Sequence, residues 1–197
     1  MIDMPTRRAV LGVGVLVAGS LWRIDDSLAQ APLPATPACH DGDEATLRQT
    51  EGPFFKPSSP ERTELVEAGT AGRPIELVGF VLSRACTPLA GALLDFWHAD
   101  DKGQYDNSGF RLRGHQFSDA EGRYRLRSIV PGAYTGRTRH IHVKVQPRGG
   151  RVLTTQLYFP GEPKNRSDGL FRTELLMRTT TTEQGGVLAG RFDFVLT

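Results

Sequence analysis

The sequence predicts an all-β protein, a single-domain antiparallel β-sandwich with an irregular N-terminal arm. Two observations favour this fold class. From residue 75 onward, short apolar runs of strand length alternate with clusters of turn-forming residues, a pattern typical of sandwiches. The chain also contains 22 glycines and 13 prolines among its 197 residues, so turns are frequent. This length provides one domain with a sizeable core in addition to an N-terminal extension.

Six or seven strands are expected within residues 71–197. The first apolar run is partly alternating, and residues 87–91 (TPLAG) end it. The turn Asp119-Ala120-Glu121-Gly122 joins the third strand to the fourth, because Gly122 supplies the positive φ that such a turn needs. Pro131-Gly132 ends the fourth strand, and residues 162–178 are expected to form a long loop with a helical turn near Glu174. The expected strands are 75–83, 92–99, 111–117, 123–129, 140–145, 152–159 and 187–196.

Residues 1–29 have the pattern of an export signal. Two arginines precede an apolar run at 9–22, and residues 27–29 (SLA) place small residues at the −3 and −1 positions of a cleavage site. The arginine pair favours twin-Arg export, with general secretion and an uncleaved N-terminal anchor as alternatives. The apolar run is too short and glycine-rich for a convincing membrane span. We therefore expect a periplasmic or secreted protein that begins near Gln30.

Residues 30–70 are predicted to be a linker and an irregular arm that lead into the sandwich at 71–197. Residues 30–38 are rich in proline and alanine, and a short helical turn is expected near Glu44. The two cysteines, Cys39 and Cys86, can form one disulfide in an oxidising compartment. Two free buried thiols are the alternative if the chain stays in the cytosol. Neither cysteine has a CxxC partner, which excludes a zinc-finger-type site.

Charge excludes one class of partner. The formal net charge is +2 with a pI near 8.7, and no dense run of lysine and arginine occurs. Nucleic acid is therefore not an expected partner. The sequence leaves the oligomeric state open, a homo-oligomer included.

Four side chains form the strongest candidate site. Successive side chains of a strand point to opposite faces, so in His140-Ile141-His142 both imidazoles can reach one metal while Ile141 faces the core. This spacing alone is also typical of two polar residues on a solvated strand face. Two tyrosines strengthen the metal interpretation. Tyr105 follows the strand that ends near residue 99, and Tyr134 follows the turn that leads to His140.

The donor types favour Fe(III) as the metal. A phenol ionises only near pH ~10 in the absence of a perturbing group, but a ferric ion stabilises the phenolate at neutral pH. Two phenolates and two neutral imidazoles prefer Fe(III), whereas two histidines and one carboxylate favour Fe(II). Each tyrosine taken alone is more often a packed aromatic residue with one hydrogen bond.

Several motifs, in order, carry a resemblance to a known family. They are TEGPFF at 50–55, DFWHAD at 95–100 with GQY at 103–105, DAEGRY at 119–124, PGAY at 131–134, RTRHIH at 137–142 and TQLYF at 155–159. As a set they resemble the intradiol ring-cleavage dioxygenases, which include catechol 1,2-dioxygenase and protocatechuate 3,4-dioxygenase. The resemblance covers about residues 45–160, and it is greatest to the compact protocatechuate 3,4-dioxygenase β-type unit or to the exported members.

The resemblance implies a ligand set. Tyr134 and His140 correspond to the axial iron ligands, and Tyr105 and His142 to the equatorial pair. The implied substrates are a small aromatic diol and O2, and the implied product is a cis,cis-muconate-type diacid.

The resemblance also implies roles for residues near the metal. Arg137 corresponds to an arginine beside the substrate, which would stabilise negative charge on the ring. Gln156 corresponds to a polar partner just outside the ligand set, and Tyr134, once displaced from the metal, to a proton acceptor. The alternatives are a surface charge for Arg137 and an outward strand position for Gln156. His98 is expected to be structural, and His40 and His115 to lie at the surface.

Three features depart from the family pattern. Only five residues separate Tyr134 from His140, fewer than in the well-known aromatic-degrading members. Phe54 and Phe55 stand where a tyrosine is often found. The N-terminal helical dimerisation region of catechol 1,2-dioxygenases has no counterpart.

Two other functions compete with ring cleavage. One is a non-catalytic transthyretin-like or carbohydrate-binding sandwich module, because fold does not imply function. The other is a zinc or copper enzyme that uses His140 and His142 without the tyrosines. Iron content separates the first from a dioxygenase, and colour separates the second.

Overall fold

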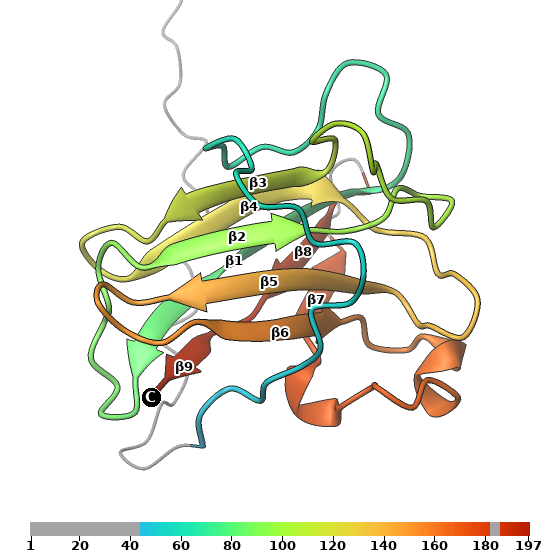
Figure 1. Cartoon of the computed structure of the whole chain (residues 1–197). Helices are drawn as coiled ribbons and strands as arrows, with labels where there is room; N and C mark the ends of the chain where they lie inside the picture. The colour runs from blue at the N-terminus through green and yellow to red at the C-terminus, as the bar shows by residue number, and fades with distance from the viewer. Residues whose placement is uncertain (1–43, 182–185) are drawn as a thin grey trace, which may run out of the picture. The chain divides into compact units, whose positions relative to one another are not determined.

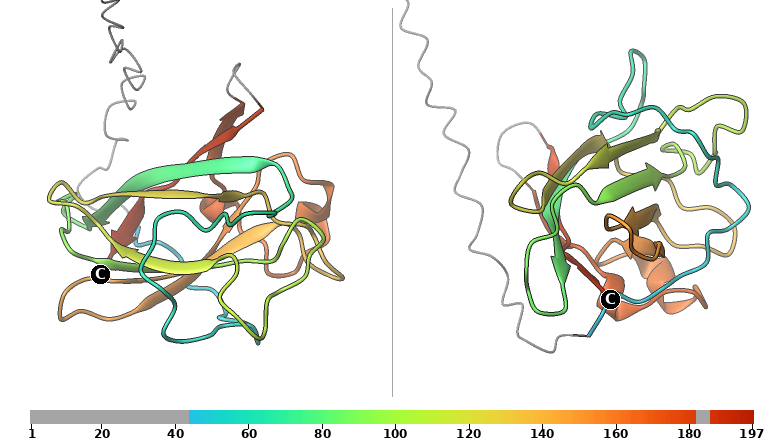
Figure 2. Two further views of the ribbon diagram at one scale, coloured as in Figure 1. Left: turned by 90° about the horizontal axis from the view of Figure 1, so that it is seen from above. Right: turned by 60° about the vertical axis from the view of Figure 1, so that its left-hand side comes forward.

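The computed structural model describes residues 44–181 and 186–197, and within them two β-sheets face each other (Figure 1). Figure 2 shows the sheets as separate layers. The first sheet has the order β3-β2-β5-β6, with β2 at Leu93–Trp97, β3 at Arg113–Phe117, β5 at His140–Gln146 and β6 at Leu153–Tyr158. The second has the order β4-β1-β8-β7, with β1 at Pro74–Ser83, β4 at Arg123–Ile129, β7 at Arg178–Thr181 and β8 at Leu188–Arg191, and β9 at Phe194–Leu196 pairs with β1. The predicted β-sandwich is confirmed.

The core lies between the two sheets and follows from the period-2 alternation of the strands. Ile141 and Val143 of β5 are fully buried, as is Leu94 of β2. They belong to one apolar cluster with Leu77 and Leu126 of the second sheet. Alternation therefore turns His140 and His142 to the opposite face of β5.

The second sheet is mixed rather than purely antiparallel, which corrects the predicted strand directions. β1 pairs antiparallel with β4 but parallel with both β8 and β9. One strand was expected over 187–196, but the chain leaves β1 at Phe192 and returns to it as β9. Gly79 lies at the crossing, where a Cβ atom would stand 1.7 Å from the Phe192 carbonyl oxygen. Only glycine permits this close approach.

Short elements account for the other differences. β7 was not predicted because its sequence, RTTT, has no apolar alternation. The helical turn near Glu174 is confirmed as the 3-10 helix η2 at Thr173–Leu175, and a second one, η1, covers Pro163–Arg166. The turn expected near Glu44 is wrong, since residues 44–52 contain no helix.

The arm at residues 44–73 has no long strand or helix but is bound to both sheets. The Gln49 amide donates to the Thr154 carbonyl of β6, and the Leu65 amide donates to the Arg127 carbonyl of β4. Leu65 is fully buried. In Figure 1 the arm crosses the first sheet where β2 ends and β5 begins.

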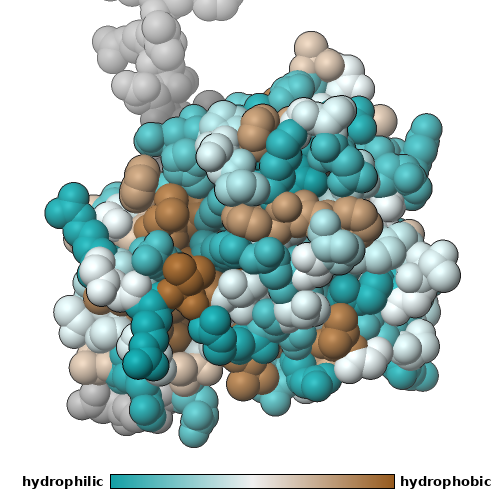
Figure 3. Space-filling view, in the orientation of Figure 1, coloured by the Kyte–Doolittle hydropathy of each residue, from teal (hydrophilic) through white to brown (hydrophobic). Residues whose placement is uncertain are grey.

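The surface of the sandwich is largely polar. Figure 3 shows hydrophilic side chains over most of one face, interrupted by small apolar areas. Among the described residues, the large apolar side chains that are exposed are Leu47, Phe117 and Leu170. None of the helices in the described part of the chain has the length and hydropathy to cross a membrane. The predictions for residues 1–43, which include the export signal, Cys39 and His40, lie outside the described residues.

Candidate metal centre

The four candidate donors meet at one edge of the first sheet. β2 and β5 are antiparallel, with Trp97 opposite His142, so the end of β2 and the start of β5 lie at the same edge. The loop after β2 carries Tyr105, and the loop before β5 carries Tyr134.

Distances confirm that the donors converge. His140 Nε2 lies 3.1 Å from His142 Nε2 and 3.3 Å from the Tyr134 hydroxyl. The Tyr105 ring centroid is 6.0 Å from that of Tyr134 and 6.3 Å from that of His142. All four side chains singled out in the sequence are therefore neighbours.

Both imidazoles are neutral, and His140 presents a lone pair to the centre of this cluster. Burial, followed by the charge of Arg137, lowers the pKa of His140 to about 4, and burial lowers the pKa of His142 well below its ordinary value. Each ring is thus uncharged at neutral pH. His140 Nδ1 lies 2.7 Å from the Thr138 carbonyl oxygen, which only accepts hydrogen bonds. Nδ1 therefore carries the proton, and Nε2 is left as the acceptor that a metal requires.

The tyrosine hydroxyls have different surroundings. The Tyr105 hydroxyl is buried and has no hydrogen-bond partner in the described part of the chain. Burial, and then the nearby Tyr134 phenol, raise the pKa of Tyr105 well above its ordinary value. A cation among the donors would give this oxygen a partner and stabilise its anion. The Tyr134 hydroxyl donates to His140 Nε2.

Aromatic rings enclose the Tyr105 and His142 side of the cluster. The indole of Trp97 stacks on His142 with centroids 4.8 Å apart and planes 9° apart. Phe54 stacks on Tyr105 at 4.3 Å, and Phe55 meets Trp97 edge-on at 4.9 Å. Phe54 and Phe55 belong to the arm, and through their rings the arm covers this end of the sheet.

A polar network encloses the Tyr134 and His140 side. Arg137 Nη2 donates to Gln156 Oε1 at 2.5 Å, and Arg137 Nε donates to Asp168 Oδ2 at 2.9 Å. Gln156 Nε2 donates to the Thr50 carbonyl. The Tyr158 hydroxyl shares its proton between Gln156 Oε1 at 3.0 Å and the Leu170 carbonyl at 2.9 Å. Gln156 is fully buried and the Arg137 side chain is 15% exposed. Arg137 is therefore not a surface charge. Gln156 faces away from the core, opposite His142 of β5, but it is covered rather than exposed to solvent.

Sequence reasoning missed three residues of these surroundings. Tyr158 belongs to the TQLYF segment but had no assigned role, and Trp97 was noted only as part of DFWHAD. Asp168 lies in a loop between η1 and η2 that matched no motif. No signal in the sequence separates Asp168 from the other polar loop residues around it.

The two other histidines of the described residues, His98 and His115, lie outside the donor cluster. His98 is buried, with Nδ1 2.7 Å from the Ala99 carbonyl and Nε2 2.7 Å from the Ser128 hydroxyl, in agreement with a structural role. His115, expected at the surface, is half-buried, and its Nδ1 lies 3.2 Å from the Ser59 hydroxyl. Across the described residues, no group of three or more His, Cys, Asp and Glu side chains could hold a metal. A four-donor site here depends on the tyrosines.

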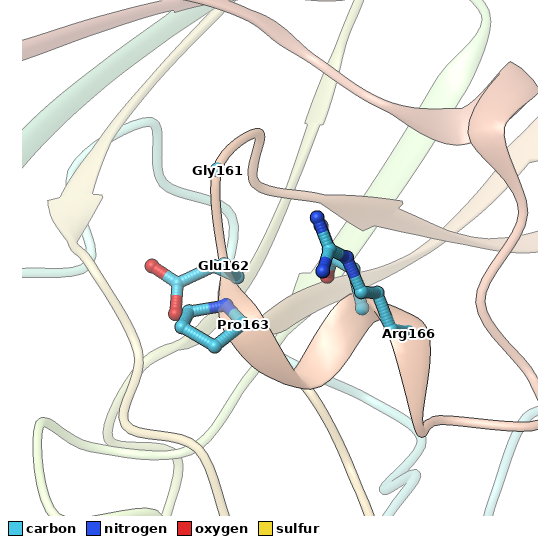
Figure 4. Close-up of a pocket in the computed structure, with 5 residues that line it drawn as sticks. Gly161, Glu162, Pro163 and Arg166 are labelled. Atoms are coloured by element: carbon cyan, nitrogen blue, oxygen red, sulfur yellow. The ribbon is translucent and has the colours of Figure 1, made fainter.

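A pocket of about 470 Å³ lies beside η1 (Figure 4). Its lining is Gly161, Glu162, Pro163, Asn165 and Arg166. Glu162 forms an ion pair with Arg139 at 3.2 Å, and Asn165 accepts a hydrogen bond from the Thr138 hydroxyl. None of the four donor side chains lines this pocket, so the donor cluster is a separate feature.

The donor set fits a ferric ion. It combines two neutral imidazole nitrogens with two phenol oxygens, one of which is buried without a partner. Nitrogen and anionic oxygen donors suit Fe(III). The residues that could hold the ion are Tyr105, Tyr134, His140 and His142.

Comparison with known proteins identifies the family of the chain. A family model described as Dioxygenase matches residues 50–197. The chain is 34% identical over 152 residues to the protocatechuate 3,4-dioxygenase beta chain of Burkholderia cepacia, covering 64% of this chain and 65% of that protein. It is 34% identical over 154 residues to catechol 1,2-dioxygenase 2 of Acinetobacter lwoffii, covering 65% and 56%. The chain thus spans about half to two thirds of the length of these relatives.

Solved structures give the same result. The dioxygenase domain of a dioxygenase carbohydrate-binding protein fusion from the cellulolytic bacterium Streptomyces sp. SirexAA-E is 57% identical, with a TM-score of 0.75 over 78% of this chain and 98% of that one. The 3-chlorocatechol 1,2-dioxygenase of Rhodococcus opacus 1CP is 28% identical, with a TM-score of 0.71 over 77% and 72%.

Proposed function

The chain belongs to the intradiol ring-cleavage dioxygenase family, and from that premise we propose that it cleaves a catechol-type ring with O2 by means of bound Fe(III). The bond broken lies between the two hydroxylated carbons. Both oxygen atoms enter the product, a cis,cis-muconate-type diacid. The observation that carries the proposal is the convergence of two imidazoles and two phenols at one sheet edge.

The proposed iron ligands are Tyr105, Tyr134, His140 and His142. When bound, the ferric ion supplies a Lewis acid that holds the ionised diol and polarises the ring. His140 is oriented for this by the bond from its Nδ1 to the Thr138 carbonyl, and His142 by stacking on Trp97.

Proton transfer is proposed to use Tyr134. Its side chain is partly exposed, and its hydroxyl lies 3.3 Å from His140 Nε2. The phenolate oxygen of Tyr134 would accept a proton from the incoming diol, and Tyr105, with its buried oxygen, would stay in place. Arg137 supplies positive charge beside the donors for negative charge that develops on the ring.

Phe54, Phe55 and Trp97 exclude water from the other side of the site. Their rings form one contiguous group with Tyr105 and His142. A site from which water is excluded strengthens every electrostatic interaction within it.

Oxygen uptake by the iron-loaded protein tests the proposal. Catechol, protocatechuate and hydroxyquinol would each be supplied, and the products identified by mass spectrometry. We expect uptake with at least one diol, a diacid that contains both atoms of labelled O2, and a visible absorption band. His140→Ala should lose iron and turnover, whereas His115→Ala, an imidazole outside the donor set, should keep both. An iron-loaded protein that consumes no O2 with any of these diols contradicts the proposal.

Metal analysis distinguishes a zinc or copper site. A site that used His140 and His142 alone would leave the buried Tyr105 hydroxyl without a partner. We expect iron, and a change of visible absorption in both Tyr105→Phe and Tyr134→Phe. Full iron occupancy with an unchanged spectrum in both variants would exclude the tyrosines as ligands.

Export and the disulfide are separate proposals. They rest on the signal pattern of residues 1–29 and on the presence of two cysteines, Cys39 and Cys86, in the remaining chain. Mass spectrometry of exported, non-reduced protein should show a chain that begins near Gln30 and lacks two hydrogens relative to its reduced form. Two free thiols in that protein would contradict the disulfide.

A further inference from the structure

Asp168 is buried in a loop that is otherwise exposed or partly exposed. Of residues 161–170 it alone is buried, and its side chain is 1% exposed, whereas apolar Pro163 and Leu170 are exposed. A buried carboxylate is uncommon unless it is paired and hydrogen-bonded. Its burial therefore needs a physical reason.

The carboxylate of Asp168 joins this loop to the segment between Tyr134 and His140. Oδ2 accepts hydrogen bonds from Arg137 Nε and from the Thr138 amide, each at 2.9 Å. Oδ1 accepts one from the Leu170 amide at 2.9 Å. Burial by itself would raise the pKa of Asp168, but the bonds from Thr138, Leu170 and Arg137 hold it below its ordinary value.

Arg137 is thereby held at two corners of its planar guanidinium. Nε is bonded to Asp168, and Nη2 to Gln156 Oε1. Gln156 is itself oriented by the Thr50 carbonyl and the Tyr158 hydroxyl. These two bonds use Nε and Nη2 and leave Nη1 for a ligand. A guanidinium fixed at two corners has one orientation available, whereas one bonded at a single corner can rotate.

We propose that Asp168 is a positioning residue for Arg137, a role that rests on the proposed function of this site. In this role Asp168 acts through Arg137, without contacting the donors or the aromatic ring of the substrate. It holds the guanidinium in one orientation, close enough to the donors for its charge to act on His140. The loop at 161–170 thus contributes to turnover through one carboxylate, and the reaction would be sensitive to small displacements of Arg137.

The chain contains a matched control for this role. Asp193 also has a largely buried carboxylate that caps a backbone amide, that of Phe80, at 2.9 Å and pairs with Arg191 at 3.4 Å. It lies between β8 and β9 of the second sheet. Asp193→Asn should therefore reduce stability without changing the kinetics of ring cleavage.

A double-mutant cycle tests the proposal with the iron-loaded full-length protein. Asp168→Asn keeps the size of the side chain and removes its charge. We expect kcat to fall on the order of 10-fold to 100-fold, with KM, iron content and visible absorption little changed. In the Arg137→Ala background the same substitution should have almost no further effect on kcat. Asp168→Glu, which keeps the charge, should recover part of the loss.

Several outcomes would overturn the proposal. One is an equal fold-loss of kcat from Asp168→Asn in both backgrounds, and another is a loss equal to that of Asp193→Asn. Failure of both Asp168→Asn and Asp168→Glu to fold or retain iron would make the carboxylate a structural group.

A second readout separates this proposal from the function itself. The same cycle is measured by urea unfolding of the metal-free protein, where Asp168→Asn and Arg137→Ala should be strongly non-additive because they remove one contact. If wild-type protein cleaves no diol but the coupling is present, the proposed function fails and the pair stands. If wild-type protein is active but the two substitutions are additive in kcat, the positioning role alone fails.

Discussion

The two halves of the donor cluster are held in place by different forces. Tyr134 and His140 lie in a polar half, where the Thr138 carbonyl and Arg137 orient and polarise them. Tyr105 and His142 lie in an aromatic half, where rings stack on them. In the aromatic half, the Tyr105 hydroxyl and His142 Nδ1 have no hydrogen-bond partner among the described residues.

This difference separates two tasks of the site. Hydrogen bonds and charges fix direction, so the polar half is prepared to bind and stabilise charged groups. Stacked rings fix the plane of the His142 and Tyr105 side chains while excluding water. They offer the Tyr105 oxygen no hydrogen-bond partner that would compete with a metal. We therefore expect that, among the residues that surround the donors, substitutions in the polar half change turnover and those in the aromatic half change metal retention.

Arg137→Ala should produce the largest effect, and it tests the polar half. Its kcat should fall about 10²-fold or more, by analogy with the loss of one oxyanion donor, while iron content and absorption stay largely intact. Arg137→Lys should recover only part, because a point charge does not reproduce the planar fork.

Arg139→Ala is the matched control for Arg137. This neighbouring arginine is 39% exposed and paired with Glu162, so its loss should change the activation free energy by less than about 0.5 kcal/mol. Wild-type turnover in iron-loaded Arg137→Ala would remove the functional distinction between the halves.

Trp97→Leu tests the aromatic half. Without the stacked indole, the His142 ring loses the contact that orients it, and iron affinity should fall about 10-fold to 100-fold. Competition with a chelator measures the affinity. Phe96→Leu is the control, because Phe96 is also fully buried on β2 but faces the core. Equal iron loss in both variants would mean that general destabilisation, rather than stacking, is the cause.

His98 provides an imidazole outside the donor cluster. Burial lowers its pKa to about 4, so between pH 6.5 and 4 the unfolded chain binds a proton that the folded chain does not. Its contribution to stability is fully present above about pH 6.5 and is lost as the pH falls. Between pH 7 and pH 5, the metal-free wild type should lose about 2 kcal/mol more unfolding free energy than His98→Gln. Parallel urea titrations would show no such difference if His98 is protonated when folded.

Tyr105→Phe should produce the smallest effect, and it should raise the stability of the metal-free protein rather than lower it. Removing a buried hydroxyl that lacks a partner should stabilise the metal-free protein by about 1 kcal/mol. Tyr134→Phe removes a bonded hydroxyl instead and should not stabilise it. Urea unfolding of the two metal-free variants compares them directly. A loss of stability in Tyr105→Phe would show that its oxygen is satisfied without a metal.

Most of the sandwich was predictable because strand alternation is a local property. The runs at 75–83, 123–129 and 140–145 reappear within one residue as β1, β4 and β5. Alternation also predicted that Ile141 faces the core while His140 and His142 share the opposite face. The motifs indicated the four side chains that lie together.

Local patterns did not predict three features of the structure. These are the pairing of β1 with β8 and β9, the burial of the Tyr105 oxygen, and the contact of Asp168 with Arg137. Asp168 and Arg137 are 31 residues apart, and Phe55 reaches Trp97 from another part of the chain. Contacts at such separations depend on how the arm and loops pack over the sheet edge, which no periodicity encodes. Local sequence thus determined which side chains face the site, and long-range packing determined which are polarised, stacked or left without a partner.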